Sequence, residues 1–119
     1  MLGLVLVLIV VLQFEGTSGV VLHLYHRAGD DVVLPCRLLS SYLWCSSIYW
    51  MYIRDPSRRF SLEVKDGKVV QSSPRAARLN VDRNCYLIIK NITAEDAGGY
   101  YCGFSIITYD DIVLLGVLT

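Results

Sequence analysis

The amino-acid sequence predicts an all-β fold, a Greek-key sandwich of two antiparallel sheets with about nine strands. Three observations support this prediction: short runs of β-branched and aromatic residues, turn signals at intervals of roughly 8–12 residues, and no helical periodicity in the apolar positions. The length of 119 residues suits a single domain. Basic and acidic residues number 11 each, without a clustered basic face, so we expect no nucleic-acid partner.

An unbroken apolar run occupies residues 2–12 and is followed by small residues at positions 16–19. A transmembrane helix needs about 20 apolar residues, whereas the core of a secretory signal needs about 7–15. We therefore expect residues 1–19 to be a signal peptide that is cleaved after Gly19, and residues 20–119 to be the mature domain. A buried strand or an uncleaved anchor is the alternative.

The first half of the mature chain contains three strand-like segments. Residues 20–26 are apolar with weak alternation, which suits a first strand. Apolar residues of one parity over 32–38 are typical of a half-buried strand, although Pro35 cannot donate to a ladder and should lie at an edge. Residues 39–47 indicate a loop, and the aromatic and β-branched run 48–54 indicates the next strand.

The second half predicts short strands that are separated by turn residues. We expect them at residues 60–64, 68–71, 78–81, 85–91, 100–104 and 112–118. Asp66-Gly67 between the first two is a strong hairpin signal, because both residues tolerate a positive φ. Residues 105–111 are expected to form the tip of the last hairpin.

Several motifs stand in an order that points to a known family: Cys36, then Trp50, then Asp96-x-Gly98-x-Tyr100-x-Cys102. With this order the whole mature chain resembles a variable-type (V-set) immunoglobulin domain. Three further runs are similar to the V-set domains of fish innate immune-type receptors, relatives of the polymeric immunoglobulin receptor group. They are Cys-Ser-Ser-Ile-Tyr-Trp, Asn-Cys-Tyr-Leu and Asn-Ile-Thr-Ala-Glu-Asp-Ala-Gly, which begin at residues 45, 84 and 91.

An even number of cysteines in a secreted chain implies disulfides, and the chain has no CxxC pair that would indicate zinc. Four cysteines allow three pairings. The resemblance implies that Cys36 and Cys102 join the two sheets and that Trp50 packs on them. Cys45 and Cys85 then remain, in loops at the same end of such a sandwich, where we expect a second disulfide. Free thiols or bonds between chains are the alternatives.

The resemblance also implies specific contacts that hold the strand expected at residues 100–104. Tyr100 is expected to close a tyrosine corner by a hydrogen bond back across the turn. Arg78 falls where V-set domains place an arginine that pairs with the aspartate before this strand, here Asp96. Leu87, Ile89 and Ile92 match core positions of the neighbouring strand and its corner.

In V-set domains the tip at residues 104–109 corresponds to the third hypervariable-type loop, with the loop around residue 42 at the same end. Apolar and aromatic residues at an exposed tip suggest a ligand surface. The candidate ligand-binding residues are Tyr42, Trp44, Phe104, Ile106, Ile107 and Tyr109. The alternative is that the two isoleucines fold onto the sheet.

Asn91-Ile92-Thr93 is an N-glycosylation acceptor at the end of a strand, where a glycan has room; an unused sequon is the alternative. The sequence contains no catalytic constellation, neither G-x-S-x-G nor a phosphate loop. His23 and His26 suit a strand edge, and the acidic pairs at 30–31 and 110–111 suit solvated turns better than calcium sites. We therefore expect no enzyme activity, cofactor or metal.

The leading hypothesis is an extracellular recognition domain of an immune-type cell-surface receptor, binding a protein or glycan ligand on another cell or in solution. It would be secreted or lie outside the plasma membrane, anchored only through a segment that this chain does not contain. The alternatives are a secreted single-domain form and an adhesion module. The adhesion module would form homo- or heterodimers through the face of the strands that the family letters G, F, C and C′, where Tyr49, Met51 and Ile53 alternate with core positions.

Overall fold

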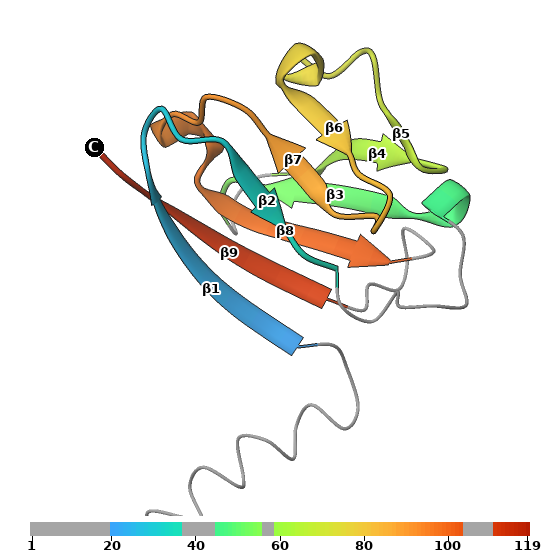
Figure 1. Ribbon diagram of the computed structural model, residues 1–119, viewed down its shortest axis with the longest axis horizontal. Helices are drawn as coiled ribbons and strands as arrows, with labels where there is room; N and C mark the ends of the chain where they lie inside the picture. Colours follow the sequence, from blue (N-terminus) through green and yellow to red (C-terminus); the bar gives the residue numbers. More distant parts are fainter. Residues whose placement is uncertain (1–19, 37–44, 56–58, 104–110) are drawn as a thin grey trace, which may run out of the picture.

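The computed structural model describes residues 20–36, 45–55, 59–103 and 111–119. Its strands are β1 (Val20–Arg27), β2 (Val32–Leu34), β3 (Tyr49–Ile53), β4 (Ser61–Lys65), β5 (Lys68–Val69), β6 (Leu79–Val81), β7 (Leu87–Ile89), β8 (Gly98–Gly103) and β9 (Asp111–Leu118). Six of them form one sheet in the order β1-β9-β8-β3-β4-β5, and the other three form a sheet in the order β2-β7-β6. Figure 1 shows the smaller sheet layered over the larger one, which confirms the predicted sandwich.

One edge of the larger sheet departs from the expected antiparallel pairing. β1 runs parallel to β9 over its whole length, from Val20 opposite Asp111 to Arg27 opposite Leu118 (Figure 1). All other described strand pairs are antiparallel. No tight turn joins the first strand to the last, so their relative direction is not fixed by a hairpin.

Several element boundaries differ from the predicted ones for identifiable reasons. β2 ends at Leu34, directly before Pro35, and lies at the edge of its sheet, as the missing proline donor requires. Arg78 is the last residue of a 3-10 helix, Ala76–Arg78, so the next strand begins one residue later than expected. No helix in the described part of the chain has the length and apolar character that crossing a bilayer requires.

The core lies between the two sheets, and two disulfides crosslink the domain. Cys36 is bonded to Cys102 and Cys45 to Cys85, so both predicted disulfides are confirmed. Their sequence separations of 66 and 40 residues correspond to about 4 kcal/mol of loop-closure entropy each in the chain-entropy model. Trp50 is fully buried, lies opposite Cys102 in the β3–β8 ladder, and donates its indole N–H to the carbonyl oxygen of Cys85 at 3.1 Å.

The β4–β5 hairpin has the predicted Asp66-Gly67 turn. Both residues have a positive φ, 52° and 77° respectively, which matches the right-handed twist of the strands. A Cβ at Gly67 would overlap the backbone carbonyl of Cys45, so the turn also packs directly on the loop that carries the second disulfide. Glycine is required here both for its φ and for this close approach.

Candidate functional site

The outward side of the six-stranded sheet carries apolar and aromatic side chains on four of its strands, β3, β4, β8 and β9. Trp50 and Tyr52 point into the core, so the alternation of β3 turns Tyr49, Met51 and Ile53 outward, as the sequence predicts. We call the following eight positions the outer face, because they alternate with core residues on their strands and none belongs to the core cluster: Tyr49, Met51, Ile53, Leu62, Gly99, Tyr101, Ile112 and Leu114.

The eight positions of the outer face carry no charge, but charged residues border them: Lys65 follows the buried Val64 on β4 and is exposed, and Arg54 and Asp55 follow Ile53. Met51 lies opposite Tyr101 on β8 and opposite Leu62 on β4. Its side chain is only 3% exposed although it lies outside the core cluster, so neighbouring side chains cover it. A surface that lacks charge at its centre and is rich in aromatic residues has the composition of a protein-interface core.

A hollow of about 480 Å³ opens at one end of the outer face. Ile53 on β3, Gly99 on β8 and Leu114 on β9 lie side by side across three neighbouring strands. Because Gly99 has no side chain, a gap separates the side chains of Ile53 and Leu114. The ring of Tyr101 forms one wall, with its Cε1 atom 3.1 Å from the position that a Cβ of Gly99 would take. Arg54, which forms an exposed ion pair with Glu95, also lines the hollow.

The apolar surface continues onto the edge strand β1. Val21 and Tyr25 alternate with core-facing positions and are 47% and 68% exposed. The ring of Tyr25 lies against Gly116 of β9, where a Cβ would clash with it. His23, which lies between Val21 and Tyr25 and opposite Leu114, is exposed on the same side, so the outward row of β1 combines apolar residues with a polar one.

A buried network of charges lies between the sheets at the same end as the hollow. Arg78 donates to both carboxylate oxygens of Asp96, at 3.1 and 3.0 Å, which is the pair that the resemblance implied. Tyr100 donates its hydroxyl to the backbone carbonyl of Asp96 at 2.6 Å and so closes the expected corner. The network fixes the chain directly before Gly98 and Gly99, and thereby the floor of the hollow.

Arg75 is the functional member of this network that the sequence did not reveal. It donates from Nη1 to Asp96 Oδ1 at 2.7 Å and to the Tyr100 hydroxyl at 2.8 Å. Its Nη2 atom lies 3.4 Å from Glu63 Oε2, an ion pair without hydrogen-bond geometry, and its guanidinium lies 4.2 Å from the centre of the Tyr52 ring. Arg75 lies between the strands expected at residues 68–71 and 78–81, where no motif points to it.

The inward position of Glu63 explains why the partner of Arg75 was missed. The β3–β4 register shifts between Trp50 and Met51, so Glu63 and Val64 are both buried instead of alternating. Glu63 accepts hydrogen bonds from Ser61 and Ser73 as well. Simple alternation along β4 does not predict such a bulge.

The environment sets the ionisation of the network. Burial alone would raise the pKa of Asp96, but hydrogen bonds from Arg78, the Thr93 amide and Arg75 hold that pKa below its ordinary value. Burial alone would lower the pKa of Arg75, yet Tyr100, Asp96 and Glu63 raise it above its ordinary value. Burial raises the pKa of Tyr100 well above its ordinary value. Asp96 and Arg75 are therefore charged at neutral pH, and Tyr100 is neutral.

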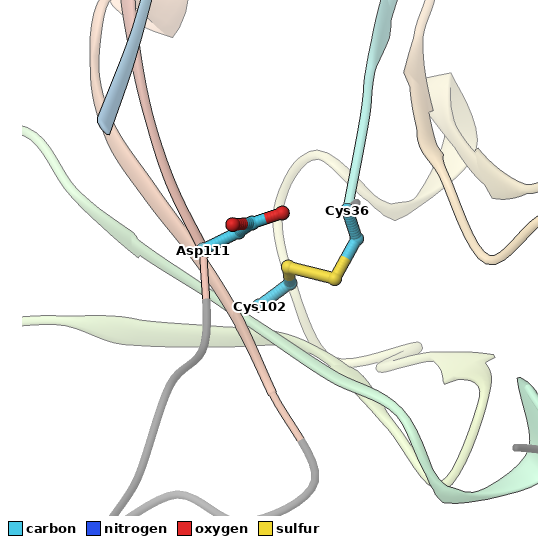
Figure 2. Close-up of side chains that lie close together, drawn as sticks. All are labelled: Cys36, Cys102 and Asp111. Atoms are coloured by element: carbon cyan, nitrogen blue, oxygen red, sulfur yellow. A yellow bond between two sulfur atoms is a disulfide. The ribbon is translucent and has the colours of Figure 1, made fainter. Parts of the chain in front are cut away.

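Asp111 corrects one expectation. The acidic pair at 110–111 suggested a solvated turn, but Asp111 begins β9 and is only 2% exposed. Figure 2 shows its carboxylate directed toward the Cys36–Cys102 disulfide, with these three groups within 4.8 Å of one another. Both sulfurs are bonded to each other and offer no thiolate, so this cluster does not have the ligand set of a metal centre.

The histidines lie at the edge strand, as expected, but one has an acidic neighbour. His26 Nδ1 lies 3.7 Å from Asp30 Oδ2, and both side chains are at least a third exposed. Asn91, the glycosylation candidate, is exposed at the end of β7 and has a φ of 51°. The candidate loop residues lie outside the described residues: Tyr42, Trp44, Phe104, Ile106, Ile107 and Tyr109.

Comparison with known families agrees with this architecture. The family model described as immunoglobulin V-set domain matches residues 25–116. A search of curated proteins finds no match. The matched span includes strands β2 to β8 entirely, both disulfides and every position of the outer face.

Proposed function

Because the chain belongs to the immunoglobulin V-set family, we propose that it is the extracellular ligand-recognition domain of an immune-type cell-surface receptor. V-set domains are typically extracellular or cell-surface binding modules and generally not enzymes. The resemblance to fish innate immune-type receptors stays a prediction, and it is the reason for the immune assignment. The proposed activity is reversible binding of a ligand on another cell or in solution.

The observation that carries this proposal is the apolar and aromatic outer face with its hollow, which Arg54 and Asp55 border. Soluble domains rarely leave a contiguous apolar surface open unless it is a contact site. Tyr49 and Tyr101, both partly exposed, are of a residue type that is enriched where two proteins meet. The face lies on a rigid sheet that two disulfides hold, so it is already in its binding shape.

The chemistry of the outer face favours a protein ligand over a glycan. Recognition of a sugar needs many directed donors and acceptors, whereas the outer face offers only the hydroxyls of Tyr49 and Tyr101. The hollow gives a place for one apolar side chain of the ligand. The loop residues Tyr42, Trp44, Phe104, Ile106, Ile107 and Tyr109 remain candidates for a second contact.

Two processing steps belong to the same proposal. We propose that residues 1–19 are removed as a signal peptide and that Asn91 carries a glycan. Asn91 follows β7, a strand of the smaller sheet, and a glycan there leaves the outer face of the larger sheet uncovered. Both steps agree with an extracellular site of action.

Fluorescent tetramers of the chain test the proposed contact, because tetravalency makes weak binding to cells measurable. Ile53→Lys and Leu114→Lys each place a charge beside the hollow. Val33→Lys is the matched control, since Val33 is 48% exposed on the smaller sheet. We expect the two outer-face variants to lose staining by at least about tenfold, and the control to stain as the wild type does.

Thermal unfolding of all three variants shows whether they remain folded. If the folded outer-face variants stain cells like the wild type, the outer face is not the contact. If the control loses staining to the same degree, the binding does not depend on which sheet is altered, and the proposal is wrong.

A further inference from the structure

We propose that two copies of this chain join edge to edge through their β1 strands, in an antiparallel pair that is centred on His23. The two six-stranded sheets then continue into one another across a twofold axis perpendicular to them. The contact uses the edge of the sheet and leaves the outer face free, so it goes beyond the proposed ligand recognition.

β1 is the long one among the four edge strands of the described residues. β5 has two residues and begins with a lysine, β2 has three and is followed by Pro35, and β6 has three. In β6 the amide of Val81 also donates to the side chain of Asn80 at 2.8 Å. Short length, lysine and proline are the usual devices that keep sheet edges from pairing. β1 has eight residues, and its first six contain neither proline nor lysine, arginine or an acid.

The backbone groups along the free edge of β1 belong to Val21, His23 and Tyr25. Ala28 donates its N–H to the carbonyl oxygen of Leu118 at 2.9 Å, directly after the β1–β9 ladder. Consecutive residues of a strand direct their backbone groups to opposite edges, so the even-numbered residues of β1 bond β9 and the odd-numbered ones face away from it. Within the described residues, β1 has a neighbouring strand on the β9 side alone (Figure 1).

The groups of Arg27 agree with this direction and mark where the free edge ends. Arg27 donates its N–H to the carboxylate of Asp30 at 3.1 Å, and its carbonyl oxygen accepts the N–H of Asp30 at 3.1 Å. The turn after β1 thus occupies the backbone groups of Arg27. The other three odd-numbered residues of β1 are left open to a partner strand.

These three positions match themselves across a twofold axis at His23. In the antiparallel pair, His23 lies opposite the second copy's His23, and Val21 lies opposite the second copy's Tyr25. Opposite residues whose backbone groups face the partner exchange two hydrogen bonds, so all three open positions are satisfied at once. No other antiparallel register pairs all three of them with one another.

The side chains fit the same register. On the outward side, Val21 and Tyr25 form a β-branched–aromatic pair across the joint, a combination that stabilises sheet pairing. The ring of Tyr25 already lies against Gly116, so it is held in place before a second copy binds. On the inward side, the partly exposed Leu22 and Leu24 lie opposite each other, and Leu24 packs against the core. A second copy is therefore the partner that this edge fits.

Edge pairing would give the domain two contact surfaces in one orientation. A twofold axis perpendicular to the sheets keeps both outer faces on the same side, so both hollows face one way. Two weak contacts then act together on a surface that displays many ligand copies. A contact made by one strand pair is small, so we expect the dimer itself to be weak in solution.

Sedimentation velocity tests the pairing on the chain as secreted from animal cells, over a concentration series that reaches the millimolar range. The wild type is expected to form a reversible dimer. His23→Pro removes an N–H from the free edge and none from the β9 ladder, so it should raise the dimer dissociation constant by about 30-fold. His23→Ala is the matched control, which keeps the N–H and should dimerise within about threefold of the wild type. Thermal unfolding shows whether both variants are folded.

Cysteine substitution tests the register without the proline. Opposite residues of a hydrogen-bonded antiparallel pair have Cα atoms about 5.5 Å apart, which is within the range of a disulfide. His23→Cys should therefore form a disulfide between two copies, which peptide mapping by mass spectrometry identifies. Tyr25→Cys should form none, because the same axis separates its two copies by about 13 Å along the strands.

Three results would overturn the inference. They are a wild type that is monomeric throughout, a folded His23→Pro variant that dimerises as the wild type does, and a crosslink at position 25 with none at position 23. Each concerns the β1 edge alone. Tetramer staining of cells that depends on Ile53 and Leu114 would still support ligand recognition by the outer face, so the two proposals can fail separately.

Discussion

Ile53 lies directly opposite Gly99 in the β3–β8 ladder, so the last outward side chain of β3 has no side chain beside it on β8. Leu114 on the other side of Gly99 completes the walls of the gap. The hollow is therefore a consequence of one glycine at an outward position of a central strand. The buried network around Asp96, three residues earlier, holds this part of β8 in place.

The ionised Asp96 carboxylate is expected to make the fold sensitive to acid. Its pKa in the folded chain is below its ordinary value, so its contribution to the free energy of unfolding is complete above about pH 4 and is lost as the pH falls through the folded pKa. Asp96→Asn removes a fully buried charge that both Arg75 and Arg78 need, and should cost about 3–5 kcal/mol at pH 7.

Thermal unfolding between pH 7 and pH 3 measures both effects. The wild type should lose stability as the solution is acidified, whereas the Asp96→Asn variant should start lower and change less. Parallel curves for the two proteins would mean that Asp96 does not contribute to the acid sensitivity.

The two arginines of the network are expected to contribute unequally. The Arg75 side chain is 12% exposed and contacts Asp96, Tyr100 and Glu63, whereas that of Arg78 is 30% exposed. Arg75→Met should therefore lower the free energy of unfolding by about 3 kcal/mol, and Arg78→Met by about 1–2 kcal/mol. Urea denaturation measures the difference, and the reverse order of effects would contradict the assigned role of Arg75.

The second disulfide is expected to stabilise the domain without determining its fold. Replacing Cys45 and Cys85 together by alanine should lower the free energy of unfolding by about 2–4 kcal/mol, because the unfolded chain loses a crosslink over 40 residues. Backbone amide hydrogen exchange should then rise first in the turn at position 85. Without the disulfide this turn is held less firmly, although its backbone carbonyl still accepts the indole N–H of Trp50. An unchanged denaturation midpoint would show that this bond contributes nothing.

A glycan at Asn91 is expected when the chain is secreted from animal cells. Mass spectrometry before and after enzymatic deglycosylation measures it, and Asn91→Asp should abolish it while keeping a residue that tolerates a φ of 51°. Thr93→Ser is the matched control. Thr93 also accepts a hydrogen bond from the Glu95 amide as a helix cap, and serine supports both roles. A protein without the mass shift would contradict the prediction.

The parts of the fold that follow from local pattern were predictable. The parity of Tyr49, Met51 and Ile53 located the outer face, and Asp66-Gly67 located the hairpin. The spacing of the cysteines and the aromatic residues, read through the V-set resemblance, gave both disulfides and the Arg78–Asp96 pair. These features depend on alternation, turn chemistry and a few fixed contacts, all of which are visible in the sequence.

The parts that depend on irregular backbone were not predictable. The bulge in β4 turns Glu63 inward, and Arg75 reaches it from a loop that has no periodic signal. The acidic pair at 110–111 predicts a solvated turn, whereas β9 begins at Asp111 and buries its carboxylate. The hollow could have been found: Gly99 has the same parity as Tyr101, so alternation already turns it outward.

Site-directed photo-crosslinking on living cells tests most directly whether the outer face is the contact surface. A photo-crosslinking amino acid in place of Leu62 lies in the row of Met51 and Tyr101, and one in place of Asn80 lies on the exposed side of the smaller sheet. We predict that the probe at position 62 crosslinks the bound partner and that the probe at position 80 does not. Crosslinking from position 80 with none from position 62 would contradict the assignment of the outer face.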